Sequence, residues 1–475
     1  MRRLLSSTIL LSTGLLASAC TVGPDYVRPA VAVPKAYKEA PPGWIPARPA
    51  DRAQRGPWWQ LFHDPDLDRL EAQAIRANPG IIAADAHYRQ ALAVVDQNVA
   101  SLFPVVSLRA YEQRLTNPAV GVPLPPRTYR SASISASWVP DLWGAIRRSI
   151  EEARANAASS ADTLGAAMLS LQATLATDYF ALRIADQQRR LLDESVRADQ
   201  RALAIVRNRY RGGVAARTDV AQAQAQLAEA STQAIDIGIQ RAQLEHAIAV
   251  LTGNAPALFA IAPRGTIPAP PRIPPEIPAS LLQRRPDVAS AERLAAAANA
   301  QIGVAQSAFF PTVTLSARGG YRAANSMPLF AIPGRFWALG PYLAQTIFDG
   351  GARNALKQQA IAGYDAAVAT YRQTVLTALQ NVEDALVALR VLQQESIMEN
   401  AAVDDAEDTV RMTANQYRGG TTGYLNVISA RTTMLADRAA ALNIRGRRLA
   451  ASVALIAALG GDWSRPADTP GSRQP

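Results

Sequence analysis

The chain of 475 residues repeats its own sequence at a fixed spacing of 207 residues, and no other feature constrains its fold as strongly. Phe103–Leu108 recurs as Phe310–Leu315, and Tyr210–Gly213 recurs as Tyr417–Gly420. Because the spacing is the same for both pairs of segments, the two halves must share one set of element lengths. The chain is therefore predicted to be a tandem duplication of one structural unit.

Prolines separate the two copies. Pro270–Pro271 and Pro274–Pro275 prevent a helix between the copies, because proline lacks a backbone N–H and clashes with the preceding turn. We expect six segments: a signal peptide (1–19), a lipidated N-terminal segment (20–75), the first repeat (76–255), a proline-rich linker (256–280), the second repeat (281–462) and a C-terminal tail (463–475).

Each repeat contains a long stretch that is free to be helical. No proline occurs between Pro140 and Pro256 or between Pro341 and Pro466, and both stretches are rich in alanine, leucine and glutamine. Apolar residues recur in the first stretch with the spacing of a coiled-coil seam, at Leu164, Met168, Leu171, Leu175 and Leu182. The seam is predicted to continue to Tyr210, so a single helix would reach on the order of 100 Å.

Paired glycines are predicted to end these helices. The pairs Gly212–Gly213 and Gly419–Gly420 can adopt the left-handed conformation that terminates a helix and lets the chain reverse. Each repeat would then form a long helical hairpin, with tips near 211–219 and 418–426. The Thr218–Asp219 dipeptide is expected to open the first return helix and to cap its free N–H groups.

Short segments before each long helix have the pattern of β-strands. Apolar residues alternate with serine from Ser131 to Trp138, which is the period of a strand with one apolar face. We predict β-hairpins at about 103–140 and 310–348, so the chain is mostly α with a small β part. Strands of this kind suit a transmembrane barrel, which satisfies its backbone groups without water. A half-buried hairpin packed on a soluble core would show the same pattern, and export of the chain favours the barrel.

The assembly follows from the number of strands. Two hairpins give four strands per chain, and four strands cannot close a barrel. Two copies would give a bore filled by side chains, whereas three copies would give twelve strands and leave room for solute. We therefore predict a homotrimer with cyclic symmetry, in which the helices form a periplasmic α-barrel of antiparallel coiled coils.

The first twenty residues have the parts of an export signal. Arg2 and Arg3 precede the apolar run Leu4–Leu16, and small residues lead to Cys20, the only cysteine of the chain. Cys20 lies where a bacterial lipobox is cleaved, so we expect a covalent diacylglycerol and an N-acyl chain on it. Ala17 departs from the leucine usual at this position, and an ordinary signal followed by an incidental thiol is the alternative.

Composition argues against several other classes of protein. Three histidines and one cysteine provide no zinc cluster or disulfide framework, and no glycine-rich loop is followed by Lys-Ser or Lys-Thr. His63, His87 and His246 lie on unrelated segments, so no catalytic group and no cofactor are expected. The net charge of +10 is spread along the chain, and the two Arg-Gly-Gly triplets lie far apart, which argues against nucleic-acid binding.

Several motifs, in order, resemble one known family. Cys20–Tyr26, Trp58–Pro65, Leu282–Val288, Ala308–Pro311 and Ile347–Gly351 look like segments of the TolC-like outer-membrane efflux proteins, in the OprM/NodT lipoprotein branch. The resemblance implies a trimeric twelve-stranded barrel in the outer membrane, a periplasmic α-barrel and an equatorial belt that includes part of 20–75. It also implies docking to a periplasmic adaptor (membrane fusion) protein beneath an inner-membrane pump, which we expect to be of the resistance-nodulation-division type.

The same resemblance places the periplasmic entrance at the helical tips. The entrance and the adaptor contact would be formed by Tyr210, Gly212, Gly213, Thr218, Asp219, Tyr417, Gly419, Gly420, Leu425, Asn426 and Ser429. Thr218 and Asp219 match a tip motif of the family, and Tyr417 matches a tyrosine that can hydrogen-bond across the closed aperture.

The tips also depart from the family pattern. Asn426 and Ser429 stand where relatives often carry acidic side chains, and Thr422 stands where an arginine can lock the closed state. We expect Leu425 to form a hydrophobic constriction instead, and the entrance to be less cation-selective than in acid-ringed relatives. Simple helix capping is the alternative role of Asp219 and Asn426.

The predicted function is a passive exit duct for drugs or other small toxic compounds. Two alternatives remain: the outer-membrane component of a type I protein secretion system, which uses the same architecture, and a lipid-anchored coiled-coil scaffold without a pore. The lipoprotein start favours small-molecule efflux over protein secretion. A deletion strain that becomes drug-sensitive but still secretes protein would separate the first two, and conductance would exclude the scaffold.

Overall fold

The computed structural model describes residues 21–32, 34, 36–39, 57–116, 125–271 and 285–461. The predicted signal peptide, Cys20, the C-terminal tail and residues 282–284 lie outside these ranges. The chain divides into two compact units, the first made of 1–30, 87–161 and 290–372, and the second of 31–86, 162–289 and 373–475.

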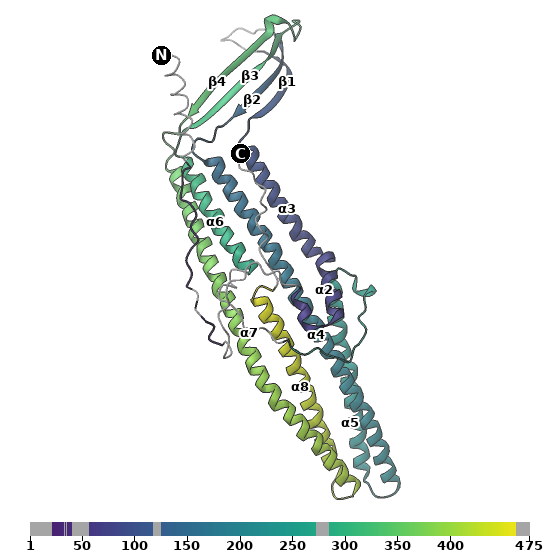
Figure 1. Cartoon of the computed structure of the whole chain (residues 1–475). Helices are drawn as coiled ribbons and strands as arrows, with labels where there is room; N and C mark the ends of the chain where they lie inside the picture. Colours follow the sequence, from purple (N-terminus) through teal and green to yellow (C-terminus); the bar gives the residue numbers. More distant parts are fainter. Residues whose placement is uncertain are drawn as a thin grey trace. The chain divides into compact units, whose positions relative to one another are not determined.

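The first unit contains an antiparallel sheet of four strands in the order β1-β2-β3-β4. The strands are β1 (Val105–Leu115), β2 (Arg127–Trp138), β3 (Thr312–Ala324) and β4 (Arg335–Ala344), with a 3-10 turn η4 (Ile332–Gly334) before β4. Each repeat contributes one hairpin, and the two hairpins join between β2 and β3, where Ala136 pairs with Ala317 (Figure 1). The two predicted hairpins therefore form a single sheet.

Helices of equal length recur in the two halves. The lengths are 22 residues for α3 (Pro79–Ala100) and α6 (Pro286–Ser307), 67 for α4 (Ala145–Arg211) and α7 (Ala352–Arg418), and 35 for α5 (Arg217–Leu251) and α8 (Tyr424–Ala458). The first half also has η1 (Trp58–Phe62), α2 (Pro65–Ala77) and η2 (Pro256–Leu258). Equal lengths at a constant spacing confirm the predicted duplication.

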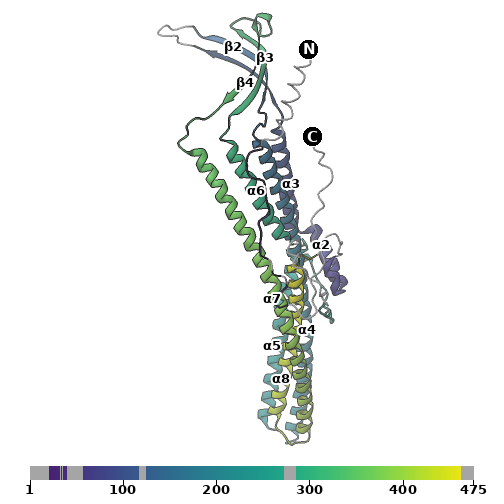
Figure 2. The same cartoon turned by 60° about the vertical axis from the view of Figure 1, so that its left-hand side comes forward.

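Two helical hairpins fill the second unit. The part of α4 in this unit returns as α5, the part of α7 returns as α8, and both hairpins reverse at the same end (Figure 2). The predicted seam is buried here, since Leu175 and Leu182 are fully covered and Leu171 is 8% exposed. Leu203 and Val206 continue the buried seam, but Tyr210 is 46% exposed. Within the single chain the buried part of the predicted seam therefore ends at Val206, and Tyr210, in the last turn of α4, is not covered.

Aromatic residues close the core of the second unit beside α4. Trp58, Trp59 and Phe62 of η1 are buried, and the Phe62 and Phe180 rings lie 4.6 Å apart. Asp64 caps α2 by accepting a hydrogen bond from Asp66 N at 3.0 Å, and it also accepts one from the Tyr179 hydroxyl of α4 at 2.7 Å, which ties this segment to the long helix. Within the described ranges, no helix combines the length and apolarity that a membrane-spanning helix requires.

Candidate functional site

The long helices end through their glycines, as predicted. Gly213 and Gly420 have φ of +77° and +76°, in the left-handed region. Val214 N donates to Arg209 O at 3.0 Å, and Thr421 N donates to Gln416 O at 3.0 Å, so each helix ends in a Schellman motif. Only the second glycine of each pair requires this conformation. Its lack of a Cβ is what lets the two tips turn tightly.

The predicted side-chain caps at the return helices are wrong. Helix α5 begins at Arg217 after Ala216, and α8 begins at Tyr424 after Gly423, with no side-chain cap on either. Thr218 and Asp219 thus lie inside the first turn of α5. The negative charge of Asp219 is still stabilised there by the positive end of the helix dipole.

Asn426 also does not cap a backbone N–H. Its Nδ2 donates to Thr422 Oγ1 at 2.6 Å, which braces the turn before α8. Leu425, Asn426 and Ser429 share the exposed side of α8, and Leu425 is 56% exposed. These three side chains therefore line one surface at the tip, and Tyr210 and Thr218 are exposed at the other hairpin.

Tyr417, in contrast, is buried at the tips. Its ring lies 5.3 Å from that of Tyr424 and belongs to a cluster with Leu203 and Val206. Burial raises the pKa of the Tyr417 phenol, an effect that nearby Arg209 opposes. The Tyr417 hydroxyl has no hydrogen-bond partner within the described part of the chain. It is thus a buried donor without an acceptor in the described chain, which leaves one hydrogen bond unmade in this arrangement of the tips.

Arg209 connects the two hairpins, and the sequence analysis did not identify it. Its guanidinium lies 4.8 Å from the centre of the Tyr417 ring, and its Nη1 donates to the carbonyl oxygens of Tyr417 (3.2 Å) and Arg418 (3.4 Å). A cation at the C-terminus of α7 also meets the negative end of that helix dipole. A comparison of the two repeats could have pointed to Arg209, because the equivalent residue in the second half is the uncharged Gln416.

An ion pair also joins the hairpins, further from the tips. Arg431 of α8 donates to Asp199 of α4 at 3.0 Å, and the Asp199 side chain is only 4% exposed. Burial raises the pKa of the Asp199 carboxyl, and Arg431 opposes that shift. The equivalent residues in the other half are Ala406 and Gln224, so this pair also breaks the internal symmetry. We call Arg209–Tyr417 and Asp199–Arg431 together the tip latch.

The sheet of the first unit has one apolar and one polar face. Cross-strand partners point to the same side, so the register of the strands sorts every side chain. The apolar face carries Val106, Leu108, Ala132, Ile134, Ala136, Trp138, Val313, Leu315, Trp337, Leu339 and Leu343. Leu108, Trp337 and Leu339 are 75–78% exposed, so no part of the described chain covers the middle of this face.

The opposite face of the sheet is polar, and the two outer strands have open edges. Ser131, Ser133, Ser135 and Ser137 lie on the polar face, as the alternating sequence predicted. Strands β1 and β4 each have a single neighbour, so the outer edge of each presents unpaired backbone groups. An exposed apolar face between two open edges is stable only if another surface covers the face and another strand pairs with each edge.

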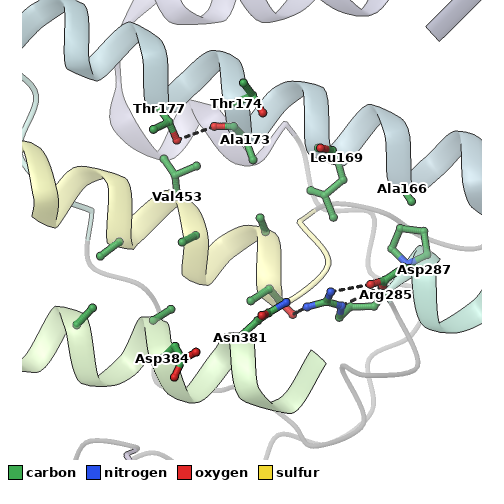
Figure 3. A pocket seen from close by; sticks show the side chains of 18 of the residues that line it. Ala166, Leu169, Ala173, Thr174, Thr177, Arg285, Asp287, Asn381, Asp384 and Val453 are labelled. Carbon is green, nitrogen blue, oxygen red and sulfur yellow. Dashed lines mark hydrogen bonds and ion pairs between the residues drawn. The ribbon is translucent and has the colours of Figure 1, made fainter. Parts of the chain in front are cut away.

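The second unit also has a cavity of about 730 Å³ between α4, α7 and α8 (Figure 3). Its walls are mostly small residues such as Ala166, Ala173 and Val453. Its charged side chains include Arg285 and Asp287, which are paired with each other at 2.7 Å. No three or more histidine, cysteine or acidic residues are placed to hold a metal in the ranges that the structure describes.

Comparison with known proteins identifies the family. The pattern of the outer membrane efflux protein family matches residues 70–254 and 277–461, so the chain belongs to that family. It is 28% identical over 458 residues to the toluene efflux pump outer membrane protein TtgC of Pseudomonas putida, covering 95% of this chain and 94% of that one. It is 26% identical to the probable outer membrane lipoprotein SilC of Salmonella typhimurium, covering 94% and 97% of the two chains.

Solved structures give the same answer. The outer-membrane channel OprN has a TM-score of 0.85 and 29% identity, and the alignment covers 94% of this chain and 100% of that one. The expected mostly helical fold with a small antiparallel sheet is confirmed. The chain is an outer-membrane efflux channel protein and not an enzyme, as expected. The expected homotrimer, periplasmic adaptor and inner-membrane pump are those of efflux channels of this kind.

Proposed function

We propose that three copies of the chain form a twelve-stranded barrel through the outer membrane and a passive exit duct for small toxic compounds. One observation carries this proposal: the sheet of four strands has an exposed apolar face and two open edges. Lipid covers the apolar face, and pairing of β1 with β4 of the next copy satisfies both edges. Three copies leave a bore wide enough for solute, whereas two do not.

Energy for export comes from the partners, because the chain has no nucleotide-binding loop. The helical tips dock to a periplasmic adaptor, which connects the duct to an inner-membrane pump of the resistance-nodulation-division type. We assign this contact and the entrance to the exposed tip residues Tyr210, Thr218, Leu425, Asn426 and Ser429. Asp219, Gly212–Gly213 and Gly419–Gly420 shape the turns that present them, and the Tyr417 hydroxyl, buried and unpaired here, can bind a partner group only after the tips rearrange.

The tip latch holds the ends of α7 and α8 in a fixed position against α4 at the entrance. Opening a bore at the tips requires α7 and α8 to move relative to α4, and both parts of the latch span that boundary. Because Thr422 replaces a locking arginine of relatives, Arg209 supplies the cation within the same chain. Leu425 then forms the apolar constriction.

We assign the lipid anchor to Cys20. Thr21 packs against Gly144, whose added Cβ would lie 2.7 Å from Thr21 Cγ2, at the junction between β2 and α4. The following residues are also fixed within the first unit, since Arg148 binds Asp25 at 2.9 Å and Tyr26 donates to Glu292 at 2.9 Å. The described residues that follow Cys20 therefore lie beside the base of the sheet, which agrees with a lipid anchor near the membrane surface. The name of the relative SilC, an outer membrane lipoprotein, supports the same modification.

The test is assembly and conductance of the purified full-length protein. We expect the mass of a trimer in mild detergent by light scattering, and ion conductance in planar lipid bilayers. A molecule that stays monomeric and conducts nothing would refute the channel and favour the scaffold. Drug sensitivity of a deletion strain with intact protein secretion is expected, and the reverse phenotype would favour type I secretion. Labelling with palmitate that is lost in Cys20→Ser tests the anchor.

A further inference from the structure

The polar face of the sheet is strongly basic. It carries Arg109 on β1, Arg127 on β2, and Arg318 and Arg322 on β3. Among the strand residues of the sheet, the single acid is Glu112, and the register places it on the opposite face, paired with Arg130 at 2.8 Å. The polar face thus has four cations and no anion along its strands.

Three of these arginines lie in adjacent cross-strand rows. Arg109 is opposite Ser133, and the next rows pair Ser135 with Arg318 and Ser131 with Arg322. Neighbouring strands are about 4.8 Å apart and successive rows on one face about 7 Å apart. The Cα atoms of any two of these arginines are thus about 12–14 Å apart. Arg318 and Arg322 both reach the Phe336 ring, however, so their guanidinium groups lie no more than about 10 Å from each other, close to the screening length of about 8 Å at physiological salt.

Neutral partners hold the guanidinium groups in place. Arg322 lies 4.9 Å and Arg318 5.5 Å from the centre of the Phe336 ring. Arg318 also donates to Ser133 Oγ at 3.4 Å. A ring face and a hydroxyl orient a guanidinium without cancelling its charge, unlike a carboxylate. No carboxylate in the described chain forms an ion pair with these arginines.

We infer that Arg109, Arg318 and Arg322 form a basic belt inside the barrel, which makes the exit preferentially permeable to anions. This inference rests on the proposed function, because lipid against the apolar face places the polar face in the bore. Three copies then line one stretch of the bore with nine of these guanidinium groups. A bore lined by one sign of charge concentrates ions of the opposite sign. The belt also attracts organic solutes that carry two or more carboxylate, sulfonate or phosphate groups, because guanidinium binds such groups through paired hydrogen bonds.

The experiment measures the chloride-to-potassium permeability ratio in planar bilayers under a KCl gradient. We expect the wild type to favour chloride, and Arg318→Gln/Arg322→Gln to lower the ratio by about twofold or more. Arg335→Gln is the matched control. It removes the same charge from an exposed residue on the opposite face of the sheet, and the ratio should stay at the wild-type value.

Arg109→Gln provides a second test, because the Arg109 side chain makes no ring or hydroxyl contact within the described part of the chain, so its loss should leave the fold intact. Trimer recovery in detergent is checked for every variant. A conducting wild type that favours potassium, or belt variants that match Arg335→Gln, would overturn the basic belt and leave the channel standing. Absence of conductance in the wild type would instead refute the proposed function.

Discussion

Replacing Leu108 by arginine places a charge in the middle of the apolar face. Leu108 is 75% exposed within one chain and lies opposite Ile134, which is 58% exposed. If lipid covers this face, a charged side chain near the middle of the membrane costs about 2–4 kcal/mol. With three copies, the barrel loses about 6–12 kcal/mol of assembly free energy. If water covers the face, the same change alters stability by only about 0.5 kcal/mol.

The adjacent residue on the same strand provides the control. Ser107 points to the opposite face, where its hydroxyl lies 2.9 Å from that of Ser135. Ser107→Arg therefore removes one hydrogen bond between exposed groups and places the cation in the water-filled bore, at a cost of about 1 kcal/mol or less. Ser107 and Leu108 are consecutive residues of β1, so the two variants place the same charge at almost the same height on the sheet but on opposite faces.

The assay is the fraction of trimer that survives graded urea or heat, measured by gel after reconstitution into vesicles. We expect Leu108→Arg to abolish or strongly reduce the trimer, and Ser107→Arg to assemble as the wild type does. Equal survival of the two variants would refute a lipid-covered apolar face. Loss of the trimer in Ser107→Arg alone would show that the faces are assigned the wrong way round.

Three further predictions concern the tips. Arg209→Ala should raise channel conductance in bilayers, because it removes a cation–π contact worth about 0.5–1 kcal/mol and two hydrogen bonds, whereas exposed Arg211→Ala should have no effect; equal conductance of the two would contradict the latch. Burial raises the pKa of the Asp199 carboxyl in the folded state, although Arg431 opposes the shift. The protonated carboxyl therefore stabilises the fold fully below the unfolded-state pKa of about 3.9, and this stabilisation is lost as the pH rises through the folded-state pKa. Wild type should therefore gain stability relative to Asp199→Asn between about pH 7 and pH 4, measured by urea midpoints, and a difference constant with pH would count against this reasoning. Gly213→Ala should lower the stability of the tip by about 1 kcal/mol, seen as faster amide exchange around the turn, because φ of +77° strains any Cβ.

Helix positions could be predicted from the sequence because their causes are local. Proline-free stretches with a heptad seam predicted α4 and α7, and a glycine pair predicted the end of each. The strands were also predictable, because one face had to be apolar at every second residue. Such elements depend only on residues that are close in the sequence, and the internal repeat shows each pattern twice.

The cap predicted for the first return helix is wrong, and the alternative capping role of Asn426 is not observed either. Thr218 and Asn426 are good capping residues, but the turns before α5 and α8 are tight enough for the helices to start earlier. Which residue occupies the first helical position depends on how the two hairpin arms pack. That packing involves residues far apart in the sequence, so local preference could not decide it.

The sequence alone determined the duplication, the long helices, their glycine turns and the two-faced strands, because periodicity and backbone sterics act over a few residues. Only the tertiary structure decided which side chains meet. It joined the hairpins of the two repeats into one sheet, collected Arg109, Arg318 and Arg322 on one face, and brought Arg209 and Asp199 to partners in the other repeat. Those pairings join residues about two hundred positions apart, where chain geometry and packing set the distance and no local preference can.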